Sequence, residues 1–86
     1  MYNIEFTKQA MKDLHRIPQG YAVLILKKVK QLSINSHNTT LDVKKLKGVE
    51  GAYRLRLGDY RVIYEIDDKR LLINIIKIQS RGNVYG

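Results

Sequence analysis

The chain has 86 residues, 44% of them apolar, and no cysteine, which predicts one small globular domain without disulfides or thiolate metal sites. Sixteen Lys and Arg outnumber eight Asp and Glu, giving a formal charge of +8. A charge of this size attracts polyanions, so nucleic acid, an anionic membrane surface and an acidic protein are all compatible partners.

The first part of the chain predicts a strand followed by a helical hairpin. Alternating apolar side chains predict a strand over residues 2–6. Apolar residues at helical spacing predict helices over residues 8–17 and 21–32. Thr7 offers an N-cap oxygen to the first helix, and Pro18 begins the break between the two.

The second part predicts three further strands. Residues 33–51 are polar and are interpreted as a long loop. Residues 52–57, 60–66 and 70–78 follow as strands joined by short turns, and the last is apolar on both sides, as expected of an interior strand. The expected fold class is α+β in a single domain: an N-terminal strand, a two-helix hairpin and an antiparallel three-strand meander. The helices would pack on one face of a four-stranded sheet.

The predicted hairpin places arginines together. If Gly58-Asp59 is a two-residue turn, Arg56 lies opposite Arg61, and alternation puts Arg54 on the same face. Like charges directly across a strand pair are destabilising, so folding alone does not call for them. Guanidinium groups suit phosphate oxygens, and we therefore interpret this face as a phosphate site, the alternative being a solvated basic face.

Further candidates lie in the loop and the tail. Lys44, Lys45 and Lys47 either position phosphates or belong to a solvated loop. Arg81 and Tyr85 follow the last strand, where the phenol could stack on a base or exchange a proton, or else pack on the rim. The two histidines are isolated and lack ligand spacing, so no metal site is expected.

The same residues resemble a known family. The resemblance rests on the sequence LKG at 46–48, the hairpin sequence YRLRLGDYRVIY at 53–64, Arg81, and the sequence VY at 84–85. Together with the order of elements, they resemble the RelE/ParE toxin superfamily over nearly the whole chain. The hairpin does not separate its two branches, the RelE-type ribonucleases and the ParE-type gyrase inhibitors.

The resemblance to the RelE-type branch implies a toxin of a type II toxin–antitoxin system that cuts messenger RNA without a metal or other cofactor. The ribose 2′-hydroxyl would attack the adjacent phosphate. By resemblance, Arg61 stabilises the phosphorane-like transition state, Arg81 neutralises or protonates the leaving group, and Tyr85 stacks on a base and is a candidate general base. Arg54 and Arg56 match two basic strand positions that bind RNA. Which group is the acid and which is the base stays open.

The resemblance also implies partners and a location. They are messenger RNA, the ribosomal A site and an acidic RelB-like antitoxin, and no membrane is expected. No apolar run is long enough to span a bilayer and no signal-peptide pattern is present, so we expect a cytoplasmic protein. Two alternatives remain: a ParE-like gyrase inhibitor without catalysis, and a non-catalytic RNA-binding module.

Overall fold

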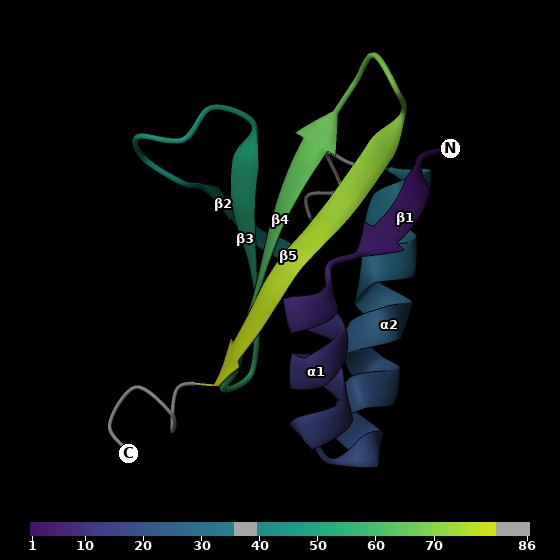
Figure 1. The fold of residues 1–86 in the computed structure, drawn as a ribbon, viewed down its shortest axis with the longest axis vertical. Coiled ribbons are helices and arrows are strands. Elements are labelled where there is room, and N and C mark those ends of the chain that lie inside the picture. Colours follow the sequence, from purple (N-terminus) through teal and green to yellow (C-terminus); the bar gives the residue numbers. More distant parts are fainter. Residues whose placement is uncertain (36–39, 81–86) are drawn as a thin grey trace.

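The computed structural model describes residues 1–35 and 40–80. Helices and strands follow one another in this order: β1 (Asn3–Phe6), α1 (Lys8–Arg16), α2 (Gln19–Ile34), β2 (Asp42–Lys45), β3 (Ala52–Leu57), β4 (Tyr60–Asp67) and β5 (Leu72–Ser80). The strands form one sheet in the order β1-β5-β4-β3-β2, and the two helices lie together on one side of it (Figure 1). The predicted α+β class and the order of strand, helical hairpin and meander are confirmed.

The sheet differs from the expected one in two ways. It has a fifth strand, β2, which pairs antiparallel with β3 at one edge. This strand lies in the polar segment that was expected to be a loop. It was not predicted because four residues with a single apolar member show no alternation of apolar and polar side chains. At the other edge β1 runs parallel to β5, so the sheet is mixed.

The core lies between the helices and the sheet. Ile25, Val29 and Leu32 of α2 are almost fully buried, as are Leu55 of β3 and Val62 of β4. Burying a side chain of this kind contributes about 1.5–3 kcal/mol relative to leaving it exposed. Since successive strand residues point to opposite faces, the same packing directs the intervening residues of β3 and β4 away from the helices.

The helices begin after the predicted signals at Thr7 and Pro18, but α2 starts at Gln19 and ends at Ile34, two residues beyond the predicted range at each end. Thr7 caps α1, its Oγ1 accepting a hydrogen bond of 3.0 Å from the backbone N–H of Ala10. Pro18 is the N-cap residue of α2, with an extended backbone that separates the helices. None of the helices in the described ranges is long and apolar enough to cross a membrane.

Candidate nucleic-acid interface

The candidate site lies on the sheet face that α1 and α2 leave uncovered, which we call the open face. Arg56 of β3 is directly opposite Arg61 of β4, as the two-residue turn predicted. Asp42 of β2 lies on the other side of Arg56, and Gln79 of β5 on the other side of Arg61. Both arginines are exposed. A row of four side chains therefore crosses the face, with two adjacent guanidinium groups at its centre.

A second row runs parallel to the first. It consists of Lys44, Arg54, Ile63 and Lys77, contributed by β2, β3, β4 and β5 in turn. Arg54 is half-buried, and its Nε is buried without a hydrogen-bond partner among the described residues. A buried donor without a partner is costly, and more so on a charged group. Its neighbours across the strands, Lys44 and Ile63, have no side-chain acceptor, so an anionic ligand could accept the hydrogen bond of this Nε.

The charge balance of the open face favours anions. The two rows contain five cationic side chains and one carboxylate, that of Asp42, which stands at the β2 edge. Glu65 is one row further, opposite Ala52 and Asn74, and is exposed. Because cations outnumber the single acid in these two rows, phosphate groups would meet several fixed cations at once.

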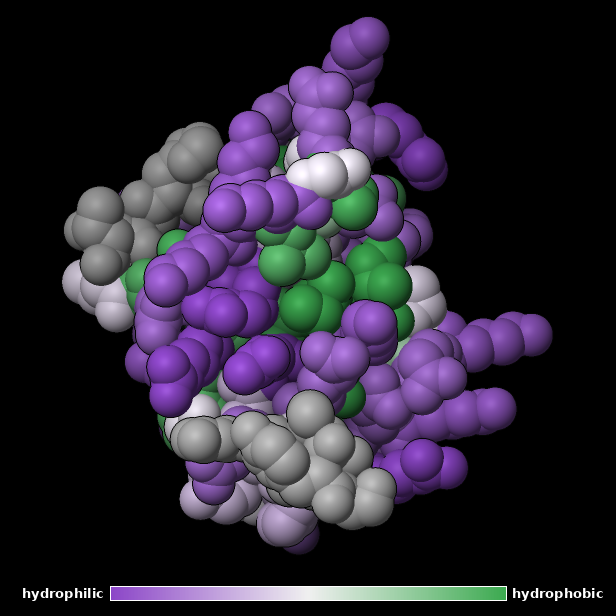
Figure 2. Space-filling view, turned by 90° about the vertical axis from the view of Figure 1, so that its left-hand side faces the viewer, coloured by the Kyte–Doolittle hydropathy of each residue, from purple (hydrophilic) through white to green (hydrophobic). Residues whose placement is uncertain are grey.

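The surface also offers apolar contact. Ile63 is half-buried between Arg54 and Lys77 in the second row. In the view from the side on which β2 and β3 lie, hydrophilic side chains cover most of the surface (Figure 2). Single-stranded nucleic acid combines an anionic backbone with flat bases, and both kinds of surface are used in binding it.

The predicted lysine cluster is divided by the structure. Lys44 lies on the open face, opposite Arg54, whereas Lys45 is opposite Tyr53 and therefore on the side of the helices. Lys47 lies in the turn between β2 and β3, and all three lysines are exposed. Arg81 and Tyr85, the tail residues expected at the site, lie outside the described residues.

Three side chains of the open face were not predicted: Asp42, Lys77 and Gln79. Asp42 was missed because β2 was not predicted. Lys77 and Gln79 were missed because strict alternation after Ile73 and Ile75 would place both on the core side. Nothing in the sequence of β5 identifies the irregularity that redirects them.

A buried phenol lies beneath this surface, on the side of the helices. Tyr64 stacks on Tyr53 with ring centroids 5.7 Å apart, and its hydroxyl is buried without a hydrogen-bond partner in the described part of the chain. Burial raises the pKa of Tyr64 far above its usual value, and the neighbouring Tyr53 raises that pKa further. Tyr64 therefore keeps its proton at neutral pH and is not a base for a ligand on the open face.

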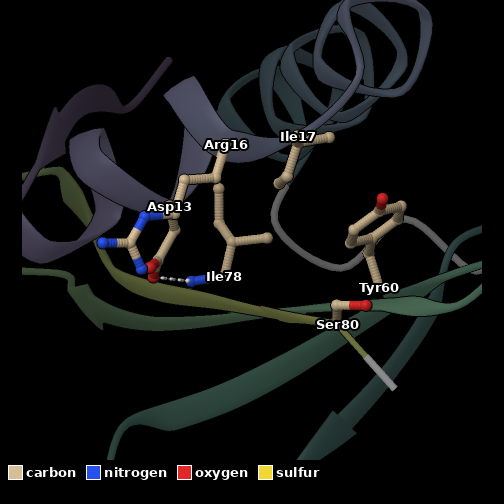
Figure 3. Close-up of a pocket in the computed structure, with 6 residues that line it drawn as sticks. All are labelled: Asp13, Arg16, Ile17, Tyr60, Ile78 and Ser80. Atoms are coloured by element: carbon tan, nitrogen blue, oxygen red, sulfur yellow. Dashed lines mark hydrogen bonds between the residues drawn. The ribbon is translucent and has the colours of Figure 1, made fainter. Parts of the chain in front are cut away.

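A small pocket is present on the helix side of the sheet. It measures about 130 Å³ and is lined by Asp13, Arg16, Ile17, Tyr60, Ile78 and Ser80 (Figure 3). Oδ2 of Asp13 accepts a hydrogen bond of 2.9 Å from the backbone N–H of Ile78, so this carboxylate is occupied by β5. The pocket is too small for a nucleotide, and the sheet separates it from Arg54, Arg56 and Arg61 of the open face.

Comparisons with known proteins show the family and the fold. A profile of the family described as the ParE toxin of type II toxin–antitoxin system, parDE, matches residues 4–85. The toxin RelE of Mycobacterium tuberculosis is 34% identical, over 98% of this chain and 86% of that protein. The mRNA interferase toxin RelE of Escherichia coli K12 is 22% identical, over 98% of this chain and 90% of that protein. The archaeal RelE–RelB complex from Pyrococcus horikoshii OT3 contains a chain of similar structure, with a TM-score of 0.81 and 36% identity over 94% of this chain and 96% of that one.

Proposed function

Since this chain belongs to the RelE/ParE superfamily, the toxins of type II toxin–antitoxin systems, we propose that it is a ribosome-dependent, metal-free endoribonuclease. It cleaves messenger RNA and so inhibits translation in the cytoplasm, where ribosomes work. The observation that supports this most strongly is the pairing of Arg56 with Arg61 on the open face. Folding gains nothing from that pair, whereas a reaction that accumulates charge on a phosphate gains from both cations.

The proposed chemistry is an internal transfer of the phosphate. The ribose 2′-oxygen forms a bond to the adjacent phosphorus, the bond from phosphorus to the 5′-oxygen breaks, and a cyclic phosphate and a free 5′-hydroxyl result. The proton of the 2′-hydroxyl leaves to a base, and the departing 5′-oxygen gains a proton. The transition state has more negative charge on its phosphate oxygens than the substrate, so fixed cations beside it lower the barrier.

Each residue has a part in this reaction. By resemblance, Arg61 would face the phosphate that reacts, while Arg54 and Arg56 would hold the backbone beside it. The parts of Arg81, neutralising the leaving group, and Tyr85, stacking on a base and exchanging a proton, rest on the resemblance. Ribosomal docking would supply the alignment that an open face without a deep cleft lacks.

An acidic antitoxin is part of the proposal. The archaeal relative was crystallised as a complex of RelE with RelB, and the formal charge of +8 makes an acidic partner complementary to this chain. By covering Arg56 and Arg61, such a partner would block access of RNA to the open face.

Cleavage mapping on a translating messenger tests the reaction. Purified wild-type protein, Arg61→Ala and Arg70→Ala are added to ribosomes stalled on a defined messenger, and 5′ ends are mapped by primer extension. Arg70 is exposed and precedes β5, outside the two rows of the open face. Arg70→Ala therefore controls for the loss of one positive charge. We expect cuts in the A-site codon, a loss of about 10²-fold or more with Arg61→Ala, and no loss with Arg70→Ala.

Other outcomes identify other functions. Salt-sensitive RNA binding with no cuts by the wild type would indicate a non-catalytic RNA-binding module. Equal cleavage by wild type and Arg61→Ala would remove Arg61 from the reaction.

Gyrase inhibition is a second candidate, because the matching family profile is described as a ParE toxin. Induction in growing cells separates the two functions. A ribonuclease causes translation arrest with loss of messenger, while a gyrase inhibitor induces the DNA-damage response with messengers intact.

A further inference from the structure

The last strand contains a bulge that decides which of its side chains reach the open face. Tyr64 of β4 pairs with Ile75, but the preceding residue, Ile63, pairs with Lys77, so Ile76 is an extra residue in β5. Without it, Lys77 would be opposite Val62 and would point into the core. The bulge therefore turns Lys77 and Gln79 outward and Ile78 inward.

Helix α1 holds the bulge in place. Strand β1 pairs with β5 only as far as Ile75, so among residues 1–35 and 40–80 no strand lies beside the edge of β5 beyond that residue. Thr7 donates twice at this point, from its backbone N–H to the carbonyl of Ile75 and from its hydroxyl to the carbonyl of Ile76. Successive carbonyls of a regular strand point to opposite edges, so bonds from one residue to both require the bend.

Asp13 completes the attachment two residues later. Its Oδ2 accepts from the N–H of Ile78 (Figure 3), and its Oδ1 accepts from Nε2 of Gln9 at 2.8 Å. A carboxylate that accepts a backbone N–H forms a strong, charge-assisted hydrogen bond. Thr7 and Asp13 thus form hydrogen bonds with β5 where β1 has ended, and they fix which side chains of β5 point to each face of the sheet.

From this geometry we propose that Lys77 is a further phosphate-binding residue of the open face and that Asp13 is the residue that positions it. Lys77 is exposed and lies opposite Ile63, diagonal to Arg61, so it extends the cationic surface from β2 to β5. Asp13 is on the opposite side of the sheet and touches no ligand. Its effect on RNA passes through the backbone of β5. The inference rests on the proposed function for its ligand, RNA, but not for cleavage.

Charge and position predict opposite effects for Asp13, which makes the test sharp. Removing a carboxylate from a cationic protein strengthens RNA binding if only net charge matters. Removing the acceptor that holds Ile78 weakens RNA binding if the position of Lys77 matters. Asp13→Ala loses the charge and the acceptor, while Asp13→Asn loses the charge but keeps an oxygen that can accept from Ile78.

The experiment measures binding of a single-stranded polyuridylate oligonucleotide across a salt series. Lys77→Gln should lower the slope of log affinity against log salt by about 0.7, which is roughly a 5- to 10-fold loss of affinity at about 50 mM salt. Lys69→Gln, in the turn before β5, is the matched control and should leave the slope unchanged. Asp13→Ala should bind more weakly than wild type, and Asp13→Asn at least as well.

A double-mutant cycle decides whether Asp13 acts through Lys77. We expect Lys77→Gln to have little further effect in the Asp13→Ala background, because the lysine is already displaced. Additive effects, or an Asp13→Ala variant that binds as tightly as Asp13→Asn, would overturn the assignment, as would a wild type that does not bind the oligonucleotide. If Asp13→Ala does not fold, the comparison of Lys77→Gln with Lys69→Gln still tests the phosphate contact. A wild type that binds RNA but never cleaves it would refute the proposed reaction and leave this assignment intact.

Discussion

Replacing Arg61 by glutamine should make the protein more stable while removing its proposed activity. Arg61 has Arg56 directly opposite on one side and neutral Gln79 on the other. Arg54 and Lys77 are its diagonal neighbours, so the immediate surroundings on these strands repel its charge. Arg56, by contrast, lies between Arg61 and the carboxylate of Asp42, so its repulsion and attraction largely offset each other.

The size of the effect follows from these positions. Two charges about 7 Å apart in a dielectric near that of water interact with about 0.6 kcal/mol, within the roughly 0.2–1 kcal/mol measured for cross-strand pairs. For a domain of this length we expect Arg61→Gln to raise Tm by about 2–5 °C at low salt. Arg56→Gln should change Tm little.

Thermal unfolding followed by circular dichroism, at low salt and at about 1 M salt, checks this reasoning. Screening at high salt should abolish the gain, because the Debye length falls to about 3 Å. Arg61→Lys keeps the charge and should show no gain. Arg70→Gln removes a charge of the turn before β5 and should have a smaller effect than Arg61→Gln. A low-salt Tm of Arg61→Gln at or below that of wild type would refute the view that the arginine pair opposes folding.

Three further predictions concern the fold. Burial keeps the Tyr64 phenol protonated at a pH where the unfolded chain has lost that proton, so wild-type stability should fall as the pH rises above about 10. Tyr64→Phe should reduce this fall in pH-dependent denaturant unfolding and, by removing an unpaired hydroxyl, should be neutral or up to about 1 kcal/mol more stable at pH 7. Gly58 has φ +59, so Gly58→Ala should cost about 1 kcal/mol by urea unfolding, whereas Gly20→Ala, in a helix with free space, should not destabilise. Ile25→Ala should cost about 2–5 kcal/mol because Ile25 is fully buried, and Leu26→Ala, on the exposed side of the same helix, much less.

The hairpin of β3 and β4 was predictable because its turn and its alternation are local signals. Gly58-Asp59 sets the loop length, which sets the register, and the register places Arg56 opposite Arg61. Apolar partners such as Leu55 and Val62 specify the same faces independently. Two signals that agree leave little freedom, so the centre of the candidate site could be predicted from the sequence.

Strand β2, the parallel pairing of β1 and the bulge of β5 could not be predicted, for a different reason. The short, polar strand β2 exists because the edge of β3 is available, and that is a tertiary fact. The parallel pairing of β1 depends on where the helical hairpin returns the chain. The bulge at Ile76 depends on hydrogen bonds from Thr7, which is 69 residues away in the sequence. Alternation alone contains none of this information.

The open face is protected by the core behind it. A slip of β3 by one residue against β4 would turn Arg54 and Arg56 into the core and expose Leu55 and Leu57, since the side-chain period of a strand is two. Burying an unpaired charge costs several kcal/mol, and exposing two buried aliphatic side chains adds about 3–6 kcal/mol. Those costs are comparable to the whole stability of a small domain. The arginine pair is unfavourable by less than about 1 kcal/mol, so the core can hold it in place at little cost. Mutations that loosen the packing of Leu55 or Val62 should therefore disturb RNA binding before they unfold the protein.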